Sequence, residues 1–212
     1  MNDIFLPNLF ILGAAKSGTT TLHKYLSLMP DVCMSVPKEP FFFEAEYEKG
    51  TKYYRNKYFT HWNGEVIIGE ARHRNLIQPY VPQRIYETNP DAKLIVLVRN
   101  PVSRAYSHWY HNYIRKSEKL KFKEAVLSDI ERIEKGLNCS TLKEIKLHAE
   151  NLPRKKKGQE KGLGLYRTYI DSGYYYEQIS RYLELFPEKQ IKVIIFEEFI
   201  SNPEQEIKNV ID

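Results

Sequence analysis

Residues 8–20 read N-L-F-I-L-G-A-A-K-S-G-T-T, a short apolar run followed directly by a loop of small and polar residues. The apolar run predicts a buried strand that ends at Gly13. One helical face follows, formed by residues that recur every three or four positions: Leu22, Tyr25, Leu26 and Met29. The stretch therefore predicts a strand, a loop and a helix, the unit from which parallel α/β sheets are built.

The clearest strand in the sequence is residues 94–98, L-I-V-L-V, which are apolar on both faces, as in a central parallel strand covered by helices. Asn100 and Pro101 follow it as a helix cap and a first helical residue. Further strands are predicted at residues 66–68 and 191–196, and further helices at residues 122–135 and 175–186. The alternation predicts an α/β, P-loop-like three-layer fold, with a central parallel sheet flanked by helices.

The composition is that of an ordinary globular domain, with 42% apolar and 28% charged residues in 212. We expect a single domain over residues 1–212 that lacks its C-terminal part, because the sequence stops inside a helical pattern. No apolar run approaches the roughly 20 residues that cross a bilayer, so no membrane span is expected. The two cysteines, Cys33 and Cys139, are too few for a disulfide framework, and we expect a cytoplasmic protein.

The net charge of +5, from 32 Lys and Arg against 27 Asp and Glu, suits an anionic ligand. It is too small to argue for nucleic acid, and we expect no nucleic-acid partner. Much of the excess lies in residues 154–161, which we interpret as a solvated loop, the alternative being a rim that attracts an acidic substrate. The sequence makes no prediction of the oligomeric state.

The loop at residues 13–20 has the chemistry of a phosphate cradle. Backbone N–H groups of such a loop point at a ligand over the helix N-terminus, where the helix dipole adds positive potential. Lys16 adds a full charge, and Ser17, Thr19 and Thr20 add hydroxyl donors. The loop departs from the nucleotide triphosphatase loop G-x-x-x-x-G-K-[ST], because Thr19 stands where that loop requires lysine.

A lysine at this inner position, as K-S-G-T-T over residues 16–20, resembles the loop of sulfotransferases that use 3′-phosphoadenosine 5′-phosphosulfate (PAPS). Residues 99–107, R-N-P-V-S-R-A-Y-S, resemble the second signature of that family, R-[DN]-P-x-x-R-x-x-S. The resemblance implies that PAPS is the sulfate donor, with its phosphosulfate in the loop and its 3′-phosphate on Arg99 and Ser107. The implied donor-binding residues are Lys16, Ser17, Gly18, Thr19, Thr20, Arg99, Ser107 and Tyr175.

Within the family, the chain is most similar in look to heparan-sulfate-type and bacterial carbohydrate sulfotransferases. Residues 37–43, P-K-E-P-F-F-F, resemble their segment that carries a catalytic glutamate. The resemblance implies Glu39 as the base, Lys16 as the residue that stabilises the leaving oxygen, and a hydroxyl or amine acceptor, expected to be a carbohydrate. We expect partial burial to raise the pKa of Glu39 toward neutrality. His73 is the second candidate base.

The sequence departs from the family at Ala71, where a catalytic lysine is common, and Arg72, His73 or Arg74 are the candidates to replace it. A basic loop that closes over the cofactor in the family is absent from the sequence. The alternatives to a sulfotransferase are a non-catalytic nucleotide-binding module and a small-molecule kinase of P-loop type.

Three variable segments are expected to form loops that hold the acceptor: residues 41–58, 72–80 and 117–164. His108 and His111 are interpreted as packing residues of the helix that follows Arg99. The six histidines and two cysteines show no zinc-type ligand spacing, so we expect no metal.

Overall fold

The computed structural model describes residues 5–137 and 167–211. Cys139 and the basic run at residues 154–161 lie outside this part of the chain. Within it, no helix is both long and apolar enough to cross a bilayer.

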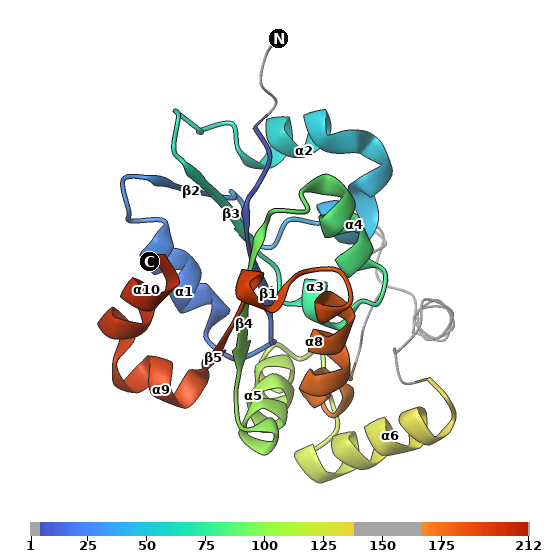
Figure 1. The fold of residues 1–212 in the computed structure, drawn as a ribbon. Coiled ribbons are helices and arrows are strands. Elements are labelled where there is room, and N and C mark those ends of the chain that lie inside the picture. The colour runs from blue at the N-terminus through green and yellow to red at the C-terminus, as the bar shows by residue number, and fades with distance from the viewer. Residues whose placement is uncertain (1–4, 138–166, 212) are drawn as a thin grey trace.

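A five-stranded, entirely parallel sheet forms the centre of the molecule, in the order β2-β3-β1-β4-β5 (Figure 1). The strands are β1 (Leu9–Gly13), β2 (Val32–Met34), β3 (Ile67–Ala71), β4 (Lys93–Val98) and β5 (Ile191–Ile195). This confirms the predicted α/β fold class. The predicted second strand extends further than expected, to Ala71, and β2 was not predicted at all because three residues are too short for a pattern.

Helices cover both faces of the sheet. The longer helices are α1 (Thr19–Leu26), α2 (Gly50–Tyr58), α4 (Val81–Thr88), α5 (Pro101–Ile114), α6 (Phe122–Glu134), α8 (Tyr175–Leu183) and α10 (Pro203–Ile211). Shorter helical segments are η1 (Phe42–Glu46), η2 (Tyr47–Lys49), α3 (Arg74–Ile77), η3 (Asp171–Gly173), η4 (Glu188–Gln190) and α9 (Phe196–Ser201).

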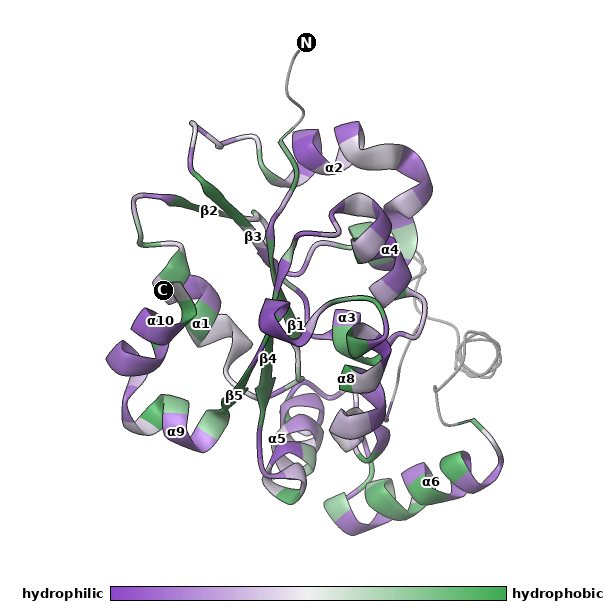
Figure 2. Cartoon of the chain, viewed as in Figure 1, coloured by the Kyte–Doolittle hydropathy of each residue, from purple (hydrophilic) through white to green (hydrophobic). Residues whose placement is uncertain are grey.

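Alternation along the central strands divides the core in two. Phe10 of β1 and Val96 of β4 face the core shared with α2, α3, α4 and α8. Ile11 and Leu97 face the opposite core, shared with α1, α9 and α10. Figure 2 shows the strands as the most uniformly hydrophobic part of the ribbon, which is what burial on both faces requires.

The segments predicted as acceptor loops contain helices instead; in residues 117–164 the helix is α6, and residues 138–164 lie outside the described part of the chain. Residues 41–58 form η1, η2 and α2, and residues 72–80 contain α3. In residues 41–58 the cause is aromatic packing: Phe42 stacks on Tyr54 with ring centroids 4.1 Å apart, and both side chains are fully buried. In α3, Leu76 and Ile77 are buried in the core. Residues 41–58 and 72–80 are therefore part of the core as well as neighbours of the site.

Glu70 of β3 is a buried carboxyl group beneath these helices, 1% exposed. It accepts hydrogen bonds from the Tyr54 hydroxyl and from Asn75 Nδ2, the latter at 2.6 Å. Burial raises the pKa of Glu70 to about 7, outweighing the two hydrogen bonds. The folded state therefore binds this proton more tightly than the unfolded chain does.

Because the folded pKa is raised, the contribution of Glu70 to stability is present in full only below pH 4.5 and is lost as the pH rises through 7. We predict that the stability advantage of the wild type over Glu70→Gln shrinks by on the order of 2–3 kcal/mol between pH 5 and 8. Urea unfolding of both proteins across this range measures the difference. Parallel stability curves would contradict the prediction.

Candidate functional site

The loop at residues 13–18 joins β1 to the N-terminus of α1 at the carboxyl edge of the sheet. Gly18, the N-cap residue, has φ 90°, and a Cβ there would lie 3.1 Å from the Phe196 ring. Only glycine fits this position without strain. The N–H groups of Thr19 and Thr20, at the start of α1, are among those for which a helix supplies no acceptor of its own.

Arg99 follows β4 and lies against the same loop. Its Nη1 donates to the carbonyl oxygen of Lys16 at 3.0 Å, and its guanidinium lies over the Phe196 ring, 4.5 Å from the centroid. The Tyr175 hydroxyl donates to the Arg99 carbonyl at 2.8 Å. The two sequence signatures and Tyr175 of α8 thus meet in space.

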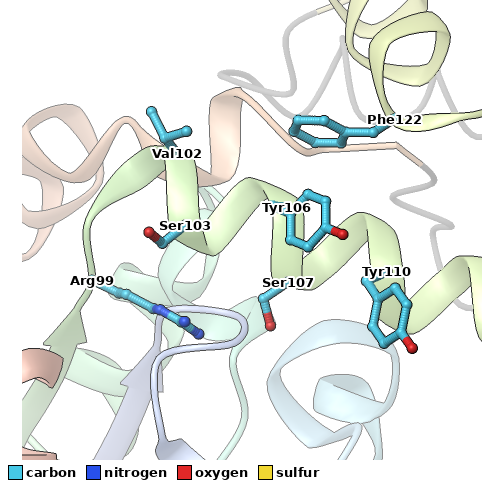
Figure 3. Close-up of a pocket in the computed structure, with 7 residues that line it drawn as sticks. All are labelled: Arg99, Val102, Ser103, Tyr106, Ser107, Tyr110 and Phe122. Atoms are coloured by element: carbon cyan, nitrogen blue, oxygen red, sulfur yellow. The ribbon is translucent and has the colours of Figure 1, made fainter.

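Arg99 and Ser107 line one open hollow of about 500 Å³ beside α5. Figure 3 shows the Arg99 guanidinium and the Ser107 hydroxyl on the same side of the helix. The remaining lining residues are Val102, Ser103, Tyr106, Tyr110 and Phe122. The spacing of Ser107, two turns into α5, therefore brings its hydroxyl to the side of the helix from which Arg99 reaches the loop.

The residues present fit an anionic, phosphate-bearing ligand. Ser17 Oγ and Arg99 Nε are buried and have no hydrogen-bond partner among the residues that the structure describes. Buried polar atoms without partners are costly, so a ligand that bonds them is stabilising. Thr19 is buried at the start of α1, whereas Thr20 is exposed. Of the predicted hydroxyl donors, Ser17 is therefore the one with an unmet bond inside the cradle.

Lys16 has a neighbour that the sequence interpretation missed. Its Nζ lies 3.4 Å from Nδ1 of His111, one turn beyond Ser107 on α5. Burial and the charges of Arg115 and Arg99 lower the pKa of Lys16. Burial and the Lys16 and Arg115 charges also lower the pKa of His111, which favours the neutral ring that can accept a hydrogen bond from Lys16. The sequence signal for this contact is the spacing of four residues between Ser107 and His111, which places both on the same face of α5.

His108 packs edge-on against Tyr169, with ring centroids 5.1 Å apart. Burial, followed by the charge of the neighbouring Arg104, lowers the pKa of His108 well below its ordinary value. Its Nδ1 is buried and has no hydrogen-bond partner within residues 5–137 and 167–211. These contacts are those of a neutral, packed histidine.

Glu39 lies beside the last residue of β3, because its N–H donates to the Ala71 carbonyl at 3.1 Å. The carboxylate is held on both oxygens: Lys38 Nζ is 2.7 Å from Oε1, and His73 Nδ1 is 3.0 Å from Oε2. The structure thus joins the two candidate bases, 34 residues apart in sequence, into one pair.

The expected pKa shift of Glu39 is wrong in direction. Burial alone would raise the pKa, but the charges and hydrogen bonds of His73 and Lys38 outweigh burial and hold it below its ordinary value. Glu39 is ionised at neutral pH and pairs with a histidine ring. This is the arrangement in which a carboxylate orients an imidazole.

Ala71 is 0% exposed and packs in the core, so its methyl group takes no part in the site. Of the three candidates to replace the family's lysine, Arg72 and Arg74 both bind the buried Glu44, the latter at 2.8 Å. His73 hydrogen-bonds Oε2 of Glu39, and Arg72 Nη1 forms a longer ion pair with the same oxygen at 3.8 Å. Across the residues that the structure describes, no group of three or more His, Cys, Asp or Glu side chains could hold a metal ion.

Curated relatives match either part or nearly all of the chain. It is 39% identical over 103 residues to heparan sulfate glucosamine 3-O-sulfotransferase 6 of Homo sapiens, covering 49% of this chain and 30% of that protein. It is 27% identical to heparan sulfate glucosamine 3-O-sulfotransferase 3B1 of Homo sapiens, covering 98% of this chain and 45% of the relative. The chain thus spans less than half the length of these relatives.

Among solved structures, a sulfotransferase from Alicyclobacillus acidocaldarius is 32% identical and superposes with a TM-score of 0.75, covering 97% of this chain and 79% of that one. The sulfotransferase domain from the curacin biosynthetic pathway, 13% identical with a TM-score of 0.53, shares the fold. A model of the sulfotransferase domain matches residues 6–212. The two signatures that meet at Arg99 and Lys16 are therefore those of a true relative, and the chain belongs to the sulfotransferase domain family.

Proposed function

We propose that the protein transfers a sulfuryl group from PAPS to a hydroxyl or amine of an acceptor, expected to be a carbohydrate. The observation that carries the proposal is the hydrogen bond between Arg99 and the Lys16 carbonyl, because it brings both donor-binding signatures to one place. Membership in the sulfotransferase family supports PAPS as donor.

The donor fits the cradle by its two charged ends. Arg99 and Ser107 would hold the 3′-phosphate, since a guanidinium fork and a hydroxyl are suited to phosphate oxygens. Ser17, Gly18, Thr19 and Thr20 would hold the phosphosulfate at the start of α1, and Tyr175 fixes the backbone of Arg99 from behind. Lys16 would stabilise the charge that develops on the leaving phosphate oxygen.

The Glu39–His73 pair would accept the proton that the acceptor loses. Nδ1 of His73 faces the Glu39 carboxylate, which stabilises the ring when it becomes charged. For the acceptor, the support is that two of the relatives are named for 3-O-sulfation of heparan sulfate glucosamine.

Thermal unfolding with added ligand tests the donor. Adenosine 3′,5′-bisphosphate is expected to raise the melting temperature, whereas ATP with Mg²⁺ is not, because only a ligand that binds the folded state stabilises it. Transfer of labelled sulfate from PAPS onto sugars, lipids and phenols then tests the activity and the acceptor class. Stabilisation by ATP with Mg²⁺ alone would favour a kinase, and bisphosphate binding without any transfer would favour a non-catalytic module.

We predict that Arg99→Ala weakens binding of adenosine 3′,5′-bisphosphate by about 1.5–3 kcal/mol, through loss of a charge-assisted contact to the 3′-phosphate. Calorimetry measures the affinity. Adenosine 5′-phosphate, which lacks the 3′-phosphate, is the control ligand and should lose less affinity, since for this ligand Arg99 acts only through its bond to the Lys16 carbonyl. Equal loss for both ligands would move Arg99 away from the 3′-phosphate.

Lys16→Ala should lower turnover more than it lowers bisphosphate affinity, because Lys16 matters most as charge builds on the leaving oxygen. Single-turnover sulfate transfer and calorimetry provide the two values. Lys24→Ala, at an exposed lysine of α1, is the control and should change neither. A loss of affinity with turnover intact would make Lys16 a binding residue only.

Glu39→Gln keeps the shape of the side chain and removes its charge. Turnover should fall by roughly 10²–10⁴-fold, the usual worth of general base catalysis, with bisphosphate affinity unchanged. His73→Ala should lower turnover within the same range, because the two side chains form one pair. Glu48→Gln, whose side chain is 91% exposed, is the matched control. Normal turnover in either pair variant would remove that residue from the proton transfer.

A further inference from the structure

Glu39 has a backbone conformation that other residues must maintain. Its φ is 69°, in the left-handed region that residues with a Cβ seldom occupy. Such conformations persist only where surrounding contacts impose them, and they cluster at active sites. The N–H of Glu39 is fixed by the Ala71 carbonyl, which leaves its own carbonyl and the segment that follows to be held by something else.

The Arg72 side chain contacts this segment at four points, one of which is an ion pair between its Nη1 and Oε2 of Glu39 at 3.8 Å. Its Nη1 donates to the Glu39 carbonyl at 3.2 Å, its guanidinium lies 4.2 Å from the Phe41 ring centroid, and its Nη2 forms an ion pair with Glu44. The side chain is 4% exposed and that of Glu44 is 1% exposed, so water competes little for these bonds.

The backbone of Arg72 is also held in place. Its N–H donates to the Ile11 carbonyl of β1 at 3.0 Å, which ties it to the centre of the sheet. Burial and the charge of Arg74 lower the pKa of Arg72 to about 10, so the guanidinium remains charged near neutral pH. Arg72 therefore connects the central sheet to the segment that contains Glu39.

We infer that Arg72 is a positioning residue that holds Glu39 in the orientation in which its carboxylate meets His73. The inference rests on the proposed function, since it assigns Arg72 a role within the proton-accepting pair. Lysine cannot reproduce this role, because only a planar guanidinium can bond a carbonyl and a carboxylate while stacking on a ring.

The test compares Arg72→Lys and Arg72→Ala with Arg84→Lys. Arg84 is a matched control: its Nη1 donates to the Phe43 carbonyl at 2.7 Å and its guanidinium lies over the Tyr47 and Tyr80 rings. Amide hydrogen exchange of Glu39 is measured by NMR, with the Ser35 amide, bonded to the Gly69 carbonyl at 2.8 Å, as the internal reference. Turnover and bisphosphate affinity are measured alongside.

In Arg72→Lys, exchange at Glu39 should become faster by about ten-fold or more, while exchange at Ser35 stays unchanged. Turnover should fall by about 10–100-fold, as expected for a misplacement near 1 Å, with bisphosphate affinity unchanged. Arg72→Ala should show the same pattern more strongly; if it does not fold, Arg72→Lys decides. Arg84→Lys should leave Glu39 exchange and turnover unchanged.

Unchanged exchange at Glu39 in Arg72→Lys would overturn the inference. So would equal acceleration at Ser35, or the same effect in Arg84→Lys, because both would indicate general loosening of the fold. If the wild type transfers sulfate to no acceptor, the proposed function fails, yet the exchange rates still decide whether Arg72 holds Glu39.

Discussion

The site depends on one constraint: all five strands run in the same direction, so their carboxyl ends lie at one edge of the sheet. β1 pairs with β3 on one side and with β4 on the other. Lys16, His73 and Arg99, which follow these three strands, are thereby brought to neighbouring positions. The chain passes from one side of β1 to the other between β3 and β4, and such a reversal creates the crevice in which ligands of open α/β sheets bind.

Positive charge is concentrated around the loop at residues 13–18. Lys16 belongs to the loop that Arg99 contacts. Burial has the largest effect in lowering the pKa of Lys16, and the positive charges of Arg115 and Arg99 lower it further. Like charges held together in a partly buried site cost free energy until an anion arrives. Ser17 Oγ and Arg99 Nε, which are buried without a hydrogen-bond partner among the described residues, also favour the binding of a ligand at this place.

The carboxyl groups near the site have been separated into different roles by their surroundings. Glu39 is ionised because His73 and Lys38 outweigh its burial, whereas burial dominates at Glu70 and raises its pKa to about 7. Opposite shifts in neighbouring carboxyl groups are a common way to divide functions between them. Glu70 accepts hydrogen bonds from Tyr54 and Asn75 inside the core and therefore has a structural role. Glu39 is the carboxyl group that pairs with His73 in the site.

The sequence by itself determined the fold class and the family, and it predicted which residues form the donor cradle. The apolar strands, the loop after β1 and the signature after β4 are local patterns. Each can be recognised in the sequence because its residues lie close together along the chain. Tertiary structure alone decided the rest. Three contacts join residues that are distant in sequence: Glu39 pairs with His73, Lys16 contacts His111, and Arg72 bonds the Glu39 carbonyl. The direction of the Glu39 pKa shift followed from those contacts, because a pKa responds to every charge around the group and not to its burial alone.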